Sequence, residues 1–463
     1  MVFLEILFDT MLLPNLRCWN DKRLTTGSEK LDMVCRKTAL KAIGFSDHAG
    51  VTRVRSFPSH REEAILESGT AWIPGNMCLT SFGNIASTNP AGATGELRMF
   101  PDTASAISLP YQYQDEEASA GFYLSNICEA DGTPWSGCPR SFLTNAVKRL
   151  QDKHGITLKV AFEHEFSLIN PRQDIVHGFS LQAMMAHKPV MESWAEALDS
   201  CNIGLELIIP EYGKGQFEVV IEPESPVKAA DNAVILKDII REVARAQQCP
   251  ITFAPKPNLY DAGNGVHIHF SLFDRDQTPL VPGDKDSTVG DTAGCFVTGI
   301  LKELSSLCAL GAATVPSYYR LQPNQWAAGR AGFGYRDREA ALRLCPGTAK
   351  TSIRRQQQAN IEYRVADATA NPYVLLGALI HAGMKALDEK AAISQPSDNI
   401  MAVATPLLTS VEEALEALTS SHFLTEALPE QLLASQVAVK HDEYEQCRKM
   451  DQSSIIGAYN VAI

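Results

Sequence analysis

Short apolar runs separated by turn residues mark the first third of the chain. Residues 38–57 have the alternation of two strands, with turn residues at 48–50 between them. Residues 61–69 have the spacing of a short helix that ends at a glycine, where a C-cap is expected. Two short strands follow within 96–111, again with turn residues between them. This pattern predicts a small α+β domain that ends near residue 134.

The pattern changes after a segment rich in Gly and Pro, 131–140, which suits a linker and precedes an amphipathic helix. From residue 157 onward, strands that carry polar residues alternate with helices such as 225–247, and the chain from about 410 has the spacing of helices. No internal repeat or low-complexity tract interrupts it. The sequence therefore predicts two domains, which span 1–134, with an unassigned extension over 1–37, and 135–463.

Four strand-like segments of the second domain carry polar residues on one face and apolar residues on the other. Glu163 and Glu165 lie two residues apart in AFEHEFSL, so their side chains leave the same face of a strand. Phe162 and Phe166 then pack behind them. An exposed strand face is the ordinary explanation for one such pair, but the pattern recurs. The other segments are 210–223 with Glu211 and Glu218, 264–272 with His267, His269 and Ser271, and 360–365 with Glu362 and Arg364.

Because these strands lie in one domain, we expect their polar faces to line a shared concave interior. A cluster of glutamate oxygens with a histidine nitrogen suits Mg²⁺ or Mn²⁺ better than zinc or copper. Such ions would offset the repulsion among the carboxylates. The pair of His267 and His269 alone would fit one packed and one exposed histidine equally well, but its position beside the glutamates favours metal binding.

Arginines add a second kind of group to this domain. Arg320 follows a tyrosine pair, and Arg336, Arg338 and Arg343 stand within one short segment. Arginine binds phosphate and carboxylate oxygens in a bidentate manner, although a solvated surface position is an equal alternative for Arg336. Divalent ions and arginines beside an acidic cluster indicate a polyphosphate substrate and a transfer reaction. The chain has no GxxxxGK[ST] motif, so a P-loop would not hold the nucleotide.

Composition narrows the expected partners. The 463 residues are 45% hydrophobic and 21% charged, which is ordinary for a globular protein with a sizeable core. The formal charge of -13 disfavours nucleic acids and anionic membranes, so small molecules or other copies of the chain are the expected partners.

Cysteine usage and the apolar segments bear on location. The 11 cysteines are scattered singly without a CxxC pair, which argues against a zinc site and a disulfide framework and indicates a reducing, cytoplasmic setting. The apolar start carries Glu5 and Asp9 and lacks a basic n-region. No apolar run elsewhere reaches the roughly 18 residues of a membrane helix.

Six segments, taken in order, resemble the signatures of the glutamine synthetase superfamily. They are AFEHEFSL, GKGQFEVVIEP, NGVHIHFSL, SYYRLQP, RDREAALR and NIEYRVADATANPYVLLGALIHAG. The resemblance covers roughly residues 38–463 and implies an α+β fold, with a small β-grasp N-terminal domain and a large catalytic domain whose curved antiparallel sheet is flanked by helices. It also implies a homo-oligomer, commonly two stacked hexameric rings with each active site between neighbouring subunits.

The same resemblance implies a two-step reaction. ATP phosphorylates the γ-carboxylate of L-glutamate, and an amine then displaces phosphate, with two to three divalent ions neutralising phosphate charge. One ion would be held by Glu165, Glu211 and Glu218, and a second by Glu163, His267 and Glu362. The other implied site residues are Gly263 and Arg320 for glutamate, Arg338 and Arg343 for the phosphates, Arg364 near the transferred phosphoryl group, and His269 and Ser271 for ATP, with Arg320, Arg338 and Arg364 as the catalytic residues.

The chain departs from the family at positions that concern ammonium. After the RLxP element, ammonia-using members carry a glutamate that helps to bind ammonium and to accept a proton, and Trp326 stands there in this chain. The family's asparagine of the NGSG element aligns with Ala262, and an arginine before the RIE motif aligns with Asn360. The region of 67–72, where the family has an aspartate for the neighbouring subunit's ammonium site, contains none.

We therefore expect the glutamyl acceptor to be an organic amine. Trp326 can form an apolar or aromatic wall for the hydrocarbon body of an amine, although it could also merely pack. Aniline or a short alkylamine fits better than a cationic polyamine, which would need acidic partners. The leading hypothesis is a γ-glutamyl amide ligase similar to γ-glutamylanilide synthase. The alternatives are a glutamine synthetase that turns over with ammonium alone, and a catalytically silent structural homologue that hydrolyses no ATP with any amine.

Overall fold

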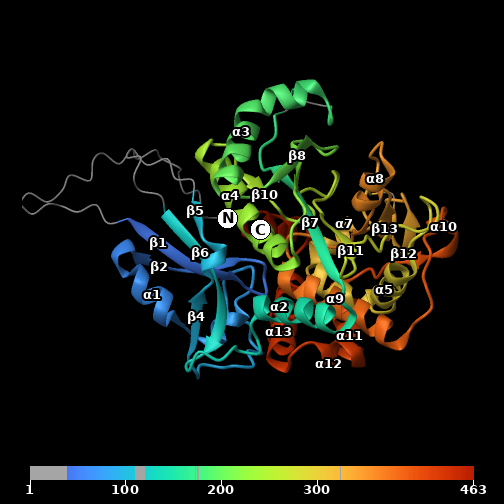
Figure 1. The fold of residues 1–463 in the computed structure, drawn as a ribbon. Coiled ribbons are helices and arrows are strands. Elements are labelled where there is room, and N and C mark those ends of the chain that lie inside the picture. The colour runs from blue at the N-terminus through green and yellow to red at the C-terminus, as the bar shows by residue number, and fades with distance from the viewer. Residues whose placement is uncertain (1–38, 110–119, 173, 175–176, 324) are drawn as a thin grey trace, which may run out of the picture. The chain divides into compact units, whose positions relative to one another are not determined.

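The computed structural model describes residues 39–109, 120–172, 174, 177–323 and 325–463 (Figure 1). The expected extension over 1–37 lies outside the described residues. Thr38–Ile463 forms one unit, within which two sheets organise the chain.

Six strands form the N-terminal sheet: β1 (Leu40–Ser46), β2 (Thr52–Pro58), β3 (Thr70–Trp72), β4 (Leu97–Pro101), β5 (Ile107–Leu109) and β6 (Ala120–Glu129). Five of them follow the order β2-β1-β6-β4-β3, and β5 pairs with β6. β1 and β6 run parallel at the centre, whereas the other pairs are antiparallel. Among the described residues of this part, one α-helix, α1 (Glu62–Ser68), follows β2, and there are three 3₁₀ turns: η1 (Ser59–Arg61), η2 (Pro74–Cys78) and η3 (Thr103–Ser105). This is the α+β arrangement that the sequence predicts.

The turn between β1 and β2 is fixed by its own residues. The Asp47 carboxylate accepts hydrogen bonds from the backbone N–H groups of Ala49 and Val51, each at 2.9 Å. Gly50 has φ 74°, a left-handed conformation that glycine adopts without steric cost. The predicted turn at 48–50 and the predicted helix before Gly69 are therefore confirmed.

Nine strands form the second sheet: β7 (Thr157–Leu168), β8 (Leu205–Pro210), β9 (Gln216–Ile221), β10 (Ile251–Thr252), β11 (Val266–Phe273), β12 (Arg330–Tyr335), β13 (Ala340–Cys345), β14 (Asn360–Tyr363) and β15 (Thr405–Pro406). Their order is β15-β12-β13-β14-β11-β7-β9-β8, with β10 paired to β7. All pairs are antiparallel except β12 and β13, which pair in parallel. Their short link, 336–339, carries Arg336 in the left-handed conformation with φ 55°.

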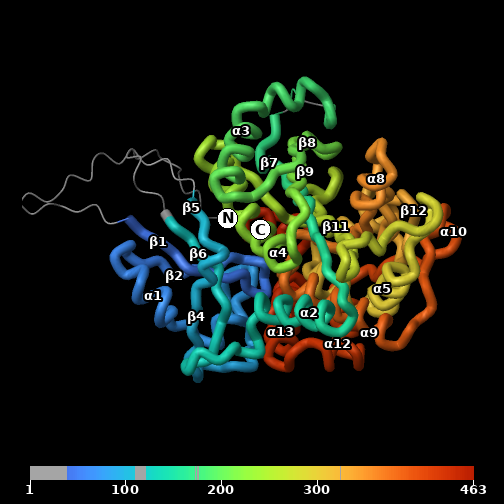
Figure 2. The backbone as a smooth tube through the Cα atoms, viewed as in Figure 1, coloured from blue at the N-terminus to red at the C-terminus, as the bar shows by residue number. Residues whose placement is uncertain are grey.

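Thirteen α-helices accompany this sheet: α2 (Pro139–His154), α3 (Leu181–Ser200), α4 (Pro226–Ala246), α5 (Asp291–Lys302), α6 (Leu304–Gly311), α7 (Val315–Arg320), α8 (Ser352–Gln358), α9 (Pro372–Glu389), α10 (Ile400–Val403), α11 (Val411–Ser420), α12 (His422–Ala427), α13 (Glu430–Cys447) and α14 (Gln452–Ala462). The figures show α2, α9 and α12 gathered on one side of the sheet (Figures 1 and 2). The predicted helix over 225–247 and the helices after residue 410 are confirmed.

The period of two along the strands separates the core from the polar face. Phe162 and Phe166 on β7, Phe217 on β9 and Ile268 on β11 are buried in one continuous core with the helices. The intervening residues on the same strands therefore face the other way. Ala49 and Cys78 of the N-terminal part pack against Ala438 and Val439 of α13. The N-terminal part, blue in Figure 2, therefore lies beside α13, which is red.

One boundary differs from the sequence expectation. The segment 131–140 was expected to be a linker, but α2 already begins at Pro139 because proline suits the first turn of a helix.

Among the described helices none alone is long and apolar enough to span a membrane. α5 and α6 reach that length and hydropathy only together, with a bend of 75° between them.

Candidate active site

Cross-strand pairing gathers the predicted acidic and histidine side chains on the polar face of the second sheet. Successive side chains of a strand leave opposite faces, so residues opposite one another on neighbouring strands lie side by side. The pairs formed in this way are Glu165 with Glu218, Glu163 with His267, His269 with Glu362, and Arg343 with Glu362.

These side chains line a cavity of about 610 Å³. Twelve of the predicted site residues are in its wall: Glu163, Glu165, Glu211, Glu218, Gly263, His267, His269, Arg320, Trp326, Arg338, Arg343 and Arg364. Glu362 is fully buried behind the wall. Ser271 is not among the lining residues, and its hydroxyl donates to the Ala359 carbonyl at 3.0 Å. Arg336 lies outside the lining too, with its guanidinium over the Tyr335 ring.

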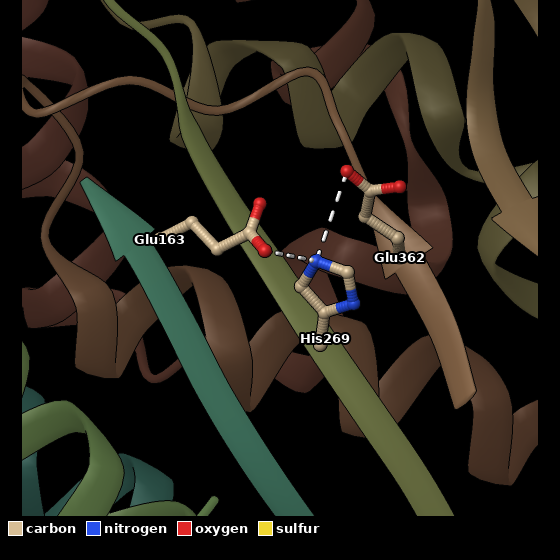
Figure 3. A group of neighbouring side chains, drawn as sticks. All are labelled: Glu163, His269 and Glu362. Carbon is tan, nitrogen blue, oxygen red and sulfur yellow. Dashed lines mark ion pairs between the residues drawn. The ribbon is translucent and has the colours of Figure 1, made fainter. Parts of the chain in front are cut away.

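Two groups of side chains offer ligand atoms close enough for a metal ion, Glu163 with His269 and Glu362, and Glu163 with Glu218 and His267. Figure 3 shows the His269 ring between the two carboxylates of the first group, with Nε2 at 3.1 Å from Glu163 and 3.8 Å from Glu362. The family resemblance implies that His267 joins Glu163 and Glu362 and that His269 contacts ATP. His267 Nδ1 also reaches Glu163, at 3.2 Å, and Glu362, at 3.7 Å. Both imidazoles therefore stand at the same two carboxylates.

The carboxylates differ in how their charge is balanced. Burial opposes ionisation of Glu362, but Arg364, the two histidines and Arg343 outweigh it and lower its pKa to about 2. Burial likewise opposes ionisation of Glu163, but His269 and His267 hold its pKa well below the usual value. The reverse holds for Glu218, whose pKa is raised to about 9 by burial and by the neighbouring glutamates. An acidic group without enough positive charge around it fits a divalent cation.

The His269 ring is oriented by its second nitrogen. Nδ1 lies 2.8 Å from the Asn360 Oδ1 atom, which can only accept, so Nδ1 donates and Nε2 faces the carboxylates. Burial would lower the pKa of His269, but Glu163, a hydrogen bond with Cys345, and Glu362 raise it well above the usual value. The imidazolium thus supplies part of the positive charge that this carboxylate group needs.

Two arginines hold Glu362 in place. Arg343 and Arg364 both donate hydrogen bonds to its carboxylate. Arg364 also donates through Nε to the Arg338 carbonyl at 3.1 Å. Their guanidinium groups lie at the cavity wall, where they could contact phosphate oxygens once a substrate is bound.

The Arg320 side chain passes close to the backbone of Gly263 and reaches the cavity. Its Nη2 donates to the carbonyls of Val365 at 2.5 Å and Ala366 at 2.9 Å, while Nε has no hydrogen-bond partner among the residues that the structure describes. A Cβ atom at Gly263 would lie 2.6 Å from Arg320 Cγ. Glycine is thus required at 263 so that the arginine can pass.

An aromatic pair stands at the mouth of the cavity. Trp326 is 66% exposed, and its ring lies 5.6 Å from that of Tyr212, which is 60% exposed, at an interplanar angle of 30°. Trp326 and Phe179, another exposed lining residue, both adopt left-handed backbone conformations, with φ 58° and 55°. Bulky side chains rarely do so, and such strain concentrates at functional sites.

The sequence reasoning missed Phe179 and Tyr212. Tyr212 directly follows Glu211 in the glycine-rich turn, so its place beside a predicted ligand was a usable signal. Phe179 offered no such signal, because its left-handed backbone and exposure depend on how β8 and α3 are placed.

Comparison with known proteins agrees with this geometry. The glutamine synthetase catalytic-domain family matches residues 136–456, and the glutamine synthetase N-terminal-domain family matches residues 33–135. The γ-glutamylpolyamine synthetase of Streptomyces coelicolor is 31% identical over 440 residues, which cover 90% of this chain and 92% of the relative. The glutamate–isopropylamine ligase of a Pseudomonas species is 25% identical over 375 residues, covering 76% and 78%.

The solved structures agree as well. The structure of a novel glutamine synthase homologue superposes with a TM-score of 0.85 at 34% identity, covering 92% of this chain and 99% of that one. Among the sequence relatives, the glutamine synthetase of Pyrococcus abyssi is 29% identical over 407 residues, which cover 83% of this chain and 86% of the relative. The chain therefore belongs to the glutamine synthetase family and is an ATP-dependent ligase that forms carbon–nitrogen bonds.

Proposed function

We propose that the protein joins the γ-carboxylate of L-glutamate to an organic primary amine with an apolar body, such as aniline or a short alkylamine. The observation that carries this proposal is the exposed Trp326 ring at the cavity mouth, at the position where ammonia-using relatives carry a carboxylate. Two relatives named for amine ligation, to polyamines and to isopropylamine, support an amine as the acceptor.

The chemistry of the acceptor follows from the missing carboxylate. Ammonium and alkylammonium ions must lose a proton before they can attack, whereas aniline is largely neutral at pH 7. The rings of Trp326 and Tyr212 can stack on or cover a hydrocarbon body, at a gain of about 1–2 kcal/mol. An arylamine therefore needs no carboxylate in the cavity to remove a proton before it attacks.

The remaining residues take the roles that the family resemblance implies. Arg320 binds a carboxylate of glutamate beside Gly263, Arg338 and Arg343 contact phosphate oxygens, and Arg364 lies near the transferred phosphoryl group. His269 and Ser271 stand on the nucleotide side. Two to three Mg²⁺ or Mn²⁺ ions, held by the glutamates and His267 with His269 as a further candidate ligand, would neutralise phosphate charge when bound.

We propose in addition a cytoplasmic homo-oligomer of two stacked hexameric rings with active sites between neighbouring subunits. Large apolar side chains near the cavity support this, because their exposure in one chain would end on assembly. Phe179 and Leu207 line the cavity, and Leu181 and Met185 are exposed at the start of α3, shortly after Phe179 in the chain. The free thiols of all nine described cysteines fit a reducing compartment.

The test is phosphate release from ATP with L-glutamate, Mg²⁺ and a panel of amines: ammonium, methylamine, isopropylamine, ethanolamine, putrescine and aniline. Mass spectrometry of the product identifies the γ-glutamyl amide. We expect the highest kcat/KM with an apolar amine. A preference for ammonium would overturn the proposal in favour of glutamine synthesis, and a preference for putrescine would assign the acceptor to the polyamines.

A further inference from the structure

Lys237 of α4 is a buried cation outside the cavity. It is 8% exposed, and among the described residues no carboxylate lies within ion-pair distance of its ammonium group. Its Nζ donates instead to two backbone carbonyls, of Gly50 at 2.7 Å and of Ala368 at 3.0 Å. Burying an ammonium without an acidic partner costs folding free energy. The role of Lys237 therefore lies in the hydrogen bonds that it donates to these two carbonyls.

Ala368 belongs to a segment that carries Arg320. This support segment, 365–369, presents the Val365 and Ala366 carbonyls that accept both hydrogen bonds of Arg320 Nη2. The Ala366 carbonyl also accepts from the Val266 N–H at 2.9 Å, one residue before His267. The position of the support segment therefore sets the position of the guanidinium.

Arg320 is bonded on one side only within the part of the chain that the structure describes. The residue is 2% exposed, Nη2 is bonded to the support segment, and Nε has no partner among the described residues. Because the guanidinium is planar, fixing one nitrogen against two carbonyls fixes the direction of the others. A shift of the segment would therefore turn the face of Arg320 that lines the cavity.

Gly50 ties the same segment to the first hairpin. A Cβ atom at Gly50 would lie 3.0 Å from the Ala368 carbonyl oxygen, so the turn sits directly on the support segment. At the other end, the Asn371 side-chain amide donates to the carbonyls of Ser46 at 3.0 Å and Asp47 at 2.9 Å. Lys237 and Asn371 thus clamp the turn and the segment together from two sides.

We infer that Lys237 is a positioning residue: its ammonium holds the support segment so that Arg320 points its free nitrogens at the glutamate carboxylate. This inference rests on the proposed role of Arg320 in binding glutamate. Without the ammonium, two buried carbonyls lose their donor and the segment can move. Misplacement of a binding group by about 1 Å is enough to cost on the order of 100-fold in activity.

The charge of Lys237 can be titrated. Burial, and then the neighbouring Arg241, lower its pKa to about 8, against the opposing effect of Asp238, Asp47 and Asp367. The charged and titratable groups that face it are Arg241 and Asp238 of α4, Asp47 of the hairpin turn, Asp367 of the support segment and His164 of β7. The ammonium is thus lost within a pH range in which activity can be measured.

The test is a set of full-length variants assayed with the amine that the wild-type protein prefers. Lys237→Met should raise the KM for glutamate by about 10- to 100-fold while the KM for ATP changes by less than about threefold. Lys228→Met, the same substitution on the same helix, should leave both constants unchanged. Equal shifts of both KM values, or no shift in either, would overturn the inference.

A pH profile separates positioning from general destabilisation. In the wild-type protein the KM for glutamate should rise above pH 8 as the ammonium is lost. Lys237→Arg, which keeps its charge, should abolish that rise, and a rise that persists in this variant would also refute the inference. Calorimetric titration of wild-type protein with glutamate, ATP and Mg²⁺ tests the proposed function separately. If glutamate does not bind in this titration, the proposed function itself is wrong.

Discussion

The glutamates of the cavity occupy two electrostatic environments. Glu163 and Glu362 are matched by histidines and arginines of the chain itself. Glu218 is surrounded by other glutamates, which together with burial raises its pKa to about 9. The polypeptide therefore balances one part of the acidic cluster and leaves the other part to be balanced by a divalent ion.

This difference predicts a pH-dependent effect of Mg²⁺ on stability. The folded-state pKa of Glu218 lies above its unfolded value, so its contribution to stability is present below about pH 4.5 and is lost as pH rises toward 9. Mg²⁺ replaces the proton, so its stabilising effect should grow with pH. Thermal unfolding at pH 6 and pH 8.5, with and without Mg²⁺, measures it.

Glu218→Gln provides the matched variant. The neutral amide should make the metal-free protein more stable than the wild type at pH 8.5 and should remove most of the gain from Mg²⁺. A Mg²⁺ effect of equal size at both pH values in the wild type would contradict the assignment of Glu218 as a ligand.

Trp326 predicts a change confined to the amine. Trp326→Ala should lower kcat/KM for the preferred apolar amine by about 5- to 30-fold, which corresponds to about 1–2 kcal/mol of lost contact, and should leave the KM for glutamate unchanged. Trp326→Phe retains a ring and should recover most of the activity. Steady-state kinetics with both substrates varied would show this, and an equal loss with ammonium would argue that Trp326 only packs.

Residue-scale prediction from the sequence succeeded where a strand period governs. Glu163, Glu165 and Glu218 reach one cavity because each faces the same side of its strand. The family resemblance implies that His269 contacts ATP, and in the structure its ring stands between Glu163 and Glu362. The strand period could not distinguish His269 from His267, because both leave the same face of β11 and reach the same two carboxylates.

At the scale of elements, two helix glycines have different surroundings, one at a close helix contact and one in open space. Gly299 brings α5 against α9 so closely that a Cβ atom would lie 2.0 Å from the Ala382 carbonyl oxygen. At Gly457 of α14, such a Cβ would have no neighbouring atom within 4 Å in the described part of the chain. The first glycine permits a helix contact, whereas the second only weakens its own helix.

The two glycines therefore predict opposite effects of the same substitution. Gly299→Ala should destabilise the protein by about 1–3 kcal/mol or prevent its folding, because the backbone must move. Gly457→Ala should stabilise it by about 0.5–1 kcal/mol through helix propensity. Denaturant unfolding of both variants checks this, and a destabilised Gly457→Ala protein would show that α14 is covered by something other than water.

Element boundaries followed from local chemistry in part. The hairpin turn and α1 could be placed from their turn and capping residues, and α4 from its spacing. The parallel pairing of β12 with β13 could not, because the strand pattern does not reveal which strands pair, and the family resemblance implies an antiparallel sheet. That link carries Arg338, whose side chain lines the cavity.

At the scale of the whole molecule, the proposed assembly predicts a measurable mass. Mass photometry should find a particle of twelve 50.5-kDa chains. Phe179→Asp and Leu181→Asp, at exposed apolar positions near the cavity, should dissociate it and reduce activity together. A fully active monomer would exclude active sites shared between subunits. The sequence could imply this assembly only through its family, because exposed apolar surface is a property of the folded chain.

The contacts of the first hairpin also bear on how the protein is made. His48 lies near the start of the described chain and contacts Gln436 of α13, 388 residues later. At about 5–20 residues per second, a ribosome needs roughly 20–80 s to synthesise that interval. The N-terminal sheet leaves the ribosomal exit tunnel before α13 is synthesised. The hairpin turn therefore stays exposed to solvent until α13 has been translated. The rate of translation between these two residues thus sets the shortest time for which the hairpin turn lacks this contact.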